Sequence, residues 1–154
     1  MKPKCFLIAG AALGLAVAGA QADTPRLADV FGDHMVLQRD VPARLFGTAD
    51  PGAAFIVSLD GADSPVRAGR DGRWWVEFPA LDMGEAHEIA LSVDGEIVQS
   101  LEDVLAGDVF LCSGQSNMEY PMSRVTYAER EVAGAGHPHL RLLHVNRALS
   151  LTPE

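Results

Sequence analysis

The sequence predicts an all-β module followed by the opening of an α/β domain. Short apolar runs bounded by turn-forming residues fill positions 23–105, a pattern typical of a β-sandwich or jelly-roll-like fold. Beyond residue 105 the order changes to a near-continuous apolar run, a helical stretch and a second apolar run, as in the strand–helix–strand unit of α/β folds. We therefore expect a leader over 1–22, a β-sandwich module over 23–105, and the truncated start of an α/β domain over 106–154.

Residues 1–22 have the three parts of a secretory signal peptide. Lys2 and Lys4 form a basic start, Cys5–Ala20 is an apolar run without a charge, and Ala20-Gln21-Ala22 is an A-x-A cleavage site. The apolar run is too short to span a membrane comfortably. We expect cleavage after Ala22 and a mature protein that is secreted or periplasmic.

Charge and cysteine usage restrict the partners and the compartment. The formal net charge is −9, and loss of Lys2 and Lys4 with the signal peptide makes it −11. This acidity argues against a nucleic-acid partner and against binding to anionic membranes. Cys112 would be the one cysteine of the mature chain, so no internal disulfide is expected. Its apolar surroundings indicate a buried, inert thiol.

Seven short strands are expected between residues 23 and 105. Asp-Gly pairs favour tight hairpins because type I′ turns need positive φ at both central residues, and such pairs occur at Asp71-Gly72 and Asp94-Gly95. The expected strands are 35–38, 43–49, 55–59, 65–68, 73–78, 89–93 and 96–98.

Two adjacent tryptophans lie in the expected strand 73–78. Alternation places Trp74 on the same face as Val76 and Phe78, so Trp74 is assigned to the core. Trp75 lies on the other face, where a sugar-stacking platform is one interpretation. Packing in a core or between domains is preferred, since large aromatic side chains are highly buried on average.

The α/β part begins with a buried strand at Val109–Cys112, because a continuous apolar run is typical of parallel sheets. A helix is expected over 126–133, where Gly134, Gly136 and Pro138 prevent its continuation. A second strand is expected over 140–145.

A serine follows the first of these strands closely. Active sites of α/β folds gather at the carboxyl ends of parallel strands, and Ser116 lies just past such an end, after a turn that Gly114 permits. A helix beginning soon afterwards would direct free backbone N–H groups at the oxyanion of an acyl-transfer intermediate. Ser116 is thus the candidate nucleophile, with Gly114, Gln115 and Asn117 in support. The alternative is an ordinary loop or helix-cap serine.

The flanking residues carry a resemblance. Met118 stands where the α/β-hydrolase elbow has its second glycine, so that motif does not fit. The stretch Leu111–Glu119, with Gly-Gln-Ser-Asn-Met at its centre, resembles block I of the SGNH (GDSL-like) hydrolases and is most similar to the sialate O-acetylesterase family. Three more segments resemble that family: 31–39, 71–74 and 103–109.

The resemblance implies a three-layer SGNH hydrolase domain and a serine esterase that removes O-acetyl groups from sialic acid or related carbohydrates without metal or cofactor. Acetylxylan esterases, which use a similar block, are an alternative. The family's base is a histidine in an Asp-x-x-His segment, and no histidine here has an aspartate three residues before it. The resemblance thus implies that the histidine and its aspartate lie outside this chain, which would be an N-terminal fragment inactive alone. Ser116 would supply the nucleophile and one backbone oxyanion donor.

Two other interpretations concern a metal site and sugar binding. His137-Pro138-His139 has a metal-like spacing, but no cluster of further ligands is nearby, whereas zinc usually has three or four protein ligands; no metal is expected. The second is a secreted, non-catalytic β-sandwich that binds sugar. The oligomeric state, the sugar and the acetyl position are left open by the sequence.

Overall fold

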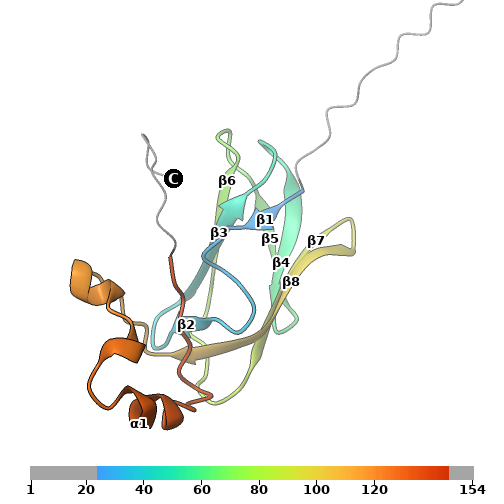
Figure 1. The fold of residues 1–154 in the computed structure, drawn as a ribbon. Helices are drawn as coiled ribbons and strands as arrows, with labels where there is room; N and C mark the ends of the chain where they lie inside the picture. Colours follow the sequence, from blue (N-terminus) through green and yellow to red (C-terminus); the bar gives the residue numbers. More distant parts are fainter. Residues whose placement is uncertain (1–23, 146–154) are drawn as a thin grey trace, which may run out of the picture.

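The computed structural model describes residues 24–145, and the predicted signal peptide lies outside them. Two β-sheets dominate the chain (Figure 1), in the strand orders β1-β3-β6 and β2-β8-β7-β4-β5. The strands are β1 (Arg26–Leu27), β2 (Val36–Gln38), β3 (Ala43–Thr48), β4 (Ala54–Leu59), β5 (Ala62–Arg67), β6 (Arg73–Phe78), β7 (His87–Val93) and β8 (Glu96–Gly107).

The two sheets share one hydrophobic core. Period-two alternation turns every second side chain inward, and Trp74, Val76 and Phe78 of β6 are buried as predicted. Side chains from both sheets form the fully buried centre: Leu45, Val57, Ile89, Leu91 and Val104. The predicted predominance of β-structure is confirmed, whereas the jelly-roll assignment stays a prediction.

Trp75 differs from the preferred interpretation. Its side chain is 63% exposed, and the Arg44 guanidinium carbon lies 5.2 Å from its ring centroid. Phe46, its cross-strand partner on β3, is also exposed. On this outer face of the three-stranded sheet, Phe31 packs against Phe46 with ring centroids 4.9 Å apart, whereas the Trp75 ring stays largely exposed.

The predicted hairpin turn is confirmed at one Asp-Gly pair and wrong at the other. Asp94 and Gly95 have φ of 51° and 87° and join β7 to β8 as a hairpin. Gly72 has φ of 75°, but Asp71 does not have positive φ. The strands on either side, β5 and β6, belong to different sheets. The turn therefore carries the chain from one sheet to the other. A local turn preference does not determine which strand will pair with the strand that follows the turn.

The last strand is much longer than the predicted 96–98. Strand β8 continues to Gly107, and its far end pairs in parallel with β2, where Val36 lies opposite Leu105 and Gln38 opposite Gly107. This pairing brings residues 36–38 beside the residues that lead to Ser116.

The predicted strands at 109–112 and 140–145 do not form among the described residues. The chain there has no regular structure, and Phe110 and Leu111 are 81% and 94% exposed. A buried parallel strand needs pairing partners and cover on both faces, and the described residues offer neither. The predicted helix is present as α1 (Ala128–Ala133), preceded by the 3₁₀ turns η1 (Ser116–Glu119) and η2 (Met122–Arg124).

None of the helices between residues 24 and 145 combines the length and the apolar character needed to cross a membrane.

Candidate functional site

Ser116 is the first residue of the turn η1, and its side chain is exposed. The turn is closed by the Met118 backbone N–H, which donates to the Gln115 carbonyl oxygen over 2.9 Å. A Cβ added at Gly114 would lie 2.6 Å from the Cγ of Met118. The local sequence thus forms a tight turn in which the Met118 side chain lies close to Gly114 and Ser116 is exposed to solvent.

Asn117 helps to end the turn. Its carbonyl oxygen accepts a hydrogen bond from the Tyr120 backbone N–H over 3.3 Å, and the backbone is extended at Tyr120 and Pro121 before η2 begins. The sequence predicted a helix soon after the serine; η1 is only four residues long. A short 3₁₀ turn still leaves backbone N–H groups at its start without partners inside the turn.

Two histidines are engaged with aspartates elsewhere. His34 Nδ1 lies 2.7 Å from Asp103 Oδ2, and His87 Nδ1 lies 2.7 Å from Asp60 Oδ2. Among residues 24–145, no hydrogen bond joins Ser116 to a histidine. A serine hydroxyl is a weak nucleophile without an adjacent base, and the described part of the chain places no such base beside the candidate nucleophile Ser116.

His87 is the buried polar residue of the core, with 5% of its surface exposed. Burial alone would lower the pKa of His87, but hydrogen bonds to Asp60 and to the Asp82 carbonyl oxygen outweigh it, so the pKa is raised. Burial would raise the pKa of Asp60, but the Glu88 backbone N–H and the His87 ring together lower it. The pair is a structural contact that joins the β4–β5 turn to β7.

The remaining candidate ligands do not gather. His137, His139 and His144 are exposed, and residues 24–145 contain no group of three or more histidine, cysteine, aspartate or glutamate side chains placed to hold a metal ion. Cys112 is exposed as well, contrary to the predicted buried thiol, because the apolar run around it forms no strand here.

Three hydrogen bonds, which sequence reasoning missed, fix the residues that lead to Ser116. The Val109 backbone N–H donates to Gln38 Oε1 over 2.9 Å, and the Arg39 backbone N–H donates to the Gly107 carbonyl oxygen over 2.9 Å. Arg39 Nε donates to Asp108 Oδ1 over 2.9 Å, and this bond raises the pKa of Arg39. The residues that form these bonds lie in two segments that resemble the family, 31–39 and 103–109. The sequence does not show that the two segments are in contact.

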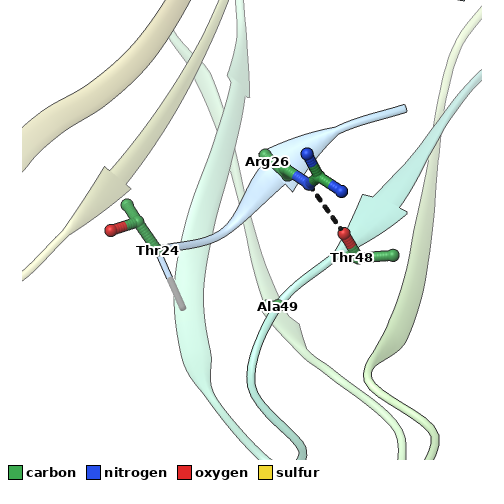
Figure 2. Close-up of a pocket in the computed structure, with 4 residues that line it drawn as sticks. All are labelled: Thr24, Arg26, Thr48 and Ala49. Atoms are coloured by element: carbon green, nitrogen blue, oxygen red, sulfur yellow. Dashed lines mark hydrogen bonds between the residues drawn. The ribbon is translucent and has the colours of Figure 1, made fainter. Parts of the chain in front are cut away.

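A pocket of about 290 Å³ lies elsewhere, where β1 meets the end of β3. Figure 2 shows Thr24, Arg26, Thr48 and Ala49 around it, with Arg26 Nε donating to Thr48 Oγ1 over 3.2 Å. Its lining includes neither a histidine nor a carboxylate to activate a hydroxyl. Ser116 is not among the lining residues, so the pocket is separate from the candidate nucleophile.

Comparison with known proteins supplies the family. No protein-family model matches the chain. Sialate O-acetylesterases from Homo sapiens and Pongo abelii are 32% identical to it over 133 residues, and the enzyme from Mus musculus is 31% identical over 132. The human match covers 79% of this chain and 25% of the relative. The crystal structure of a carbohydrate acetylesterase from Xanthomonas citri superposes with a TM-score of 0.68 and 37% identity, covering 75% of this chain and 26% of that one.

The β-rich fold and these similarities make the chain a homologue of carbohydrate acetylesterases. Over the matched residues it is a homologue of sialate O-acetylesterases, and it spans about a quarter of the length of these curated relatives. The resemblance of the four sequence segments is thereby confirmed at the level of the family.

Proposed function

We propose that this chain is the nucleophile-bearing part of an exported serine esterase that removes O-acetyl groups from sialic acid or a related carbohydrate. The observation that carries the proposal is the position of Ser116 at the start of an exposed, tight turn, in a homologue of sialate O-acetylesterases. The turn would lie in an SGNH hydrolase domain whose parallel strands form when the rest of that domain is present.

The proposed reaction is acyl transfer through a covalent intermediate. The Ser116 hydroxyl attacks the acetyl carbonyl carbon, and a histidine supplied from outside this chain takes the hydroxyl proton. The Ser116 backbone N–H donates to the oxyanion. The sugar alkoxide leaves with the proton from the histidine, and water then releases acetate from the acetyl-serine. Gly114, Gln115 and Asn117 keep the turn in place.

Substitution of Ser116 in the intact enzyme tests the proposal. We expect Ser116→Ala to lower kcat for acetate release from O-acetylated sialic acid by at least about 10³-fold, because the covalent step is lost. Ser113→Ala is the matched control, since Ser113 is an exposed serine of the same stretch, and it should retain activity. Unchanged hydrolysis by Ser116→Ala would exclude the esterase mechanism.

The substrate and the need for further residues are tested with the same assay. A panel of O-acetylated sialic acid and acetylated xylan separates the sialate hypothesis from the acetylxylan alternative by the ratio of kcat/KM. The isolated 154-residue chain should release no acetate, because Ser116 has no histidine partner among residues 24–145. Export is tested by N-terminal sequencing of the protein from its source, which should begin at Asp23.

A second function, sugar binding without catalysis, is favoured by the exposure of Trp75. An exposed indole beside the Arg44–Glu77 ion pair of 2.6 Å offers an apolar ring next to hydrogen-bonding groups. In this case sialic acid should quench tryptophan fluorescence of the chain. Trp75→Ala should abolish the quenching, whereas Ile97→Ala, which removes an exposed side chain of β8, should leave it intact. Absence of quenching in the unsubstituted chain would exclude the platform.

A further inference from the structure

The stretch from Asp33 to Arg39 contacts the chain on both sides of Ser116. On the side before Ser116, Gln38 and Arg39 hold residues 107–109 as described above. On the side after Ser116, the carbonyl oxygen of Met35 accepts a hydrogen bond from Arg141 over 3.4 Å. In Figure 1 the red segment that contains Arg141 runs past β2. The loop between these contacts carries η1, η2 and α1, so both of its ends are fastened to the same place on the β-module.

Among the charged residues that the structure describes between 108 and 145, Arg141 is unusual because its side chain is only 18% exposed. Its guanidinium donates to the backbone carbonyl oxygen of Asp103, and its second terminal nitrogen lies 2.8 Å from Asp103 Oδ2. One planar cation thus satisfies two backbone carbonyl oxygens and one carboxylate of the β-module, a geometry for which arginine is suited and lysine is not.

The acceptor side of this contact is itself held in place. Asp103 has φ of 54°, a left-handed conformation within β8, and its carboxylate also accepts from His34 over 2.7 Å. The adjacent residue Glu102 bonds in both directions with the turn before β2: its N–H donates to Asp33 Oδ1 over 2.8 Å, and its carbonyl oxygen accepts from the His34 N–H over 3.0 Å. The receptor for Arg141 is therefore built by residues 33–35 and 102–103 together.

We propose that Arg141 is a positioning residue, which fastens the far end of the Ser116 segment to the β-module at Asp103 and so sets where the nucleophile lies. The assignment rests on the proposed function of Ser116. The β-module then contributes to the reaction by holding the Ser116 segment at two points, Gln38–Arg39 before Ser116 and Asp103 after it. A displacement of about 1 Å at a reacting group can lower the rate by about 100-fold, so loss of one fastening point should affect kcat rather than substrate binding.

The contact itself is tested in the 154-residue chain by NMR. Hydrogen bonds from His34 and Arg141 hold the pKa of Asp103 below its ordinary value, so Arg141→Ala should move the pKa of the Asp103 carboxyl upward. The same substitution should raise the fast backbone motion of residues 138–145, measured by ¹⁵N relaxation. Arg124→Ala, which removes an exposed arginine of the same loop, should change neither. An Asp103 pKa and a relaxation profile that Arg141→Ala leaves unchanged would overturn the proposal.

A second variant separates the ion pair from the fold of β8. Asp103→Asn removes the charge but keeps the shape, and asparagine tolerates left-handed φ. It should mobilise residues 138–145 as Arg141→Ala does. In the intact enzyme, Arg141→Ala should lower kcat by about 10- to 100-fold with KM unchanged, and a rise in KM alone would contradict a positioning role. Full activity of Ser116→Ala would instead refute the proposed function, whatever the NMR result for Arg141.

Discussion

At the residue scale, His87 shows how a polar group can occupy an apolar core. Both of its ring nitrogens face acceptors, Asp60 Oδ2 at 2.7 Å and the Asp82 carbonyl oxygen at 3.0 Å. The protonated imidazolium donates from both nitrogens and so satisfies both acceptors. Asp60 in turn accepts from the Glu88 backbone N–H over 2.8 Å. The contact replaces the hydration that both groups lose on folding.

This contact predicts how stability depends on pH. The pKa of His87 is raised above its ordinary 6.5 in the folded chain, so its contribution is complete below about pH 6.5 and is lost as the pH rises through the folded pKa. The pKa of Asp60 is lowered below its ordinary 3.8, so that contribution is present above this pH and is lost on acidification through the folded pKa. Urea unfolding midpoints should therefore fall as the pH rises above 6.5 and through the raised pKa of His87.

Substitution of the histidine isolates the effect. His87→Gln should flatten the pH dependence above pH 6.5, because no group at that position then titrates. His139→Gln, at an exposed histidine, should retain the slope of the unsubstituted chain. If His87→Gln retained the full slope, another group would be responsible.

At the scale of the element, the β7–β8 hairpin depends on its two-residue turn. Gly95 has φ of 87°, and a Cβ there would have no heavy atom within 4 Å. Gly95→Ala should therefore lower the free energy of unfolding by about 1–2 kcal/mol through backbone strain alone. Gly136→Ala is the control, because it also has open space but no positive φ, and it should change stability little. Equal urea midpoints for the two variants would contradict this account.

The strands show which elements the sequence could predict. Strand β6 was predicted with its observed bounds, because the alternation of Trp74, Val76 and Phe78 is encoded locally. The hairpin at Asp71-Gly72 was not correct, because the destination of the following strand depends on contacts far along the chain. The strands predicted at 109–112 and 140–145 are absent from the described structure for a related reason. An apolar run becomes a strand only where other strands pair with it.

The candidate site also has a part that could be predicted from the sequence and a part that could not. The turn at Ser116 and its resemblance to esterases could be predicted from residues 111–119, because these residues are contiguous in the sequence. The pairing of Gln38 with Val109 and of Asp103 with Arg141 could not, because these partners are 71 and 38 residues apart. Alternation along the strand placed Trp74 and Trp75 on opposite faces. Nothing else in the sequence indicated that the face with Trp75 is exposed.

At the scale of the whole molecule, stability resides in the core shared by the two sheets. Leu91 is fully buried, whereas Ile97 on the adjacent strand is 68% exposed. Leu91→Ala should lower the free energy of unfolding by about 2–5 kcal/mol. Ile97→Ala should change it by no more than about 0.5 kcal/mol. Urea unfolding monitored by tryptophan fluorescence distinguishes the two, and similar losses in both variants would show that the core lies elsewhere.

The parallel pairing of β2 with β8 also has a kinetic consequence. Strands β3 to β7 lie between the two partners in the sequence, so the pairing closes a long loop, and contacts that close long loops form slowly. We expect β2 to dock late, after the β7–β8 hairpin and its neighbours have formed. Because the contacts of Gln38, Arg39 and Met35 depend on that docking, the loop around Ser116 would reach its final position only when the rest of the module has finished folding.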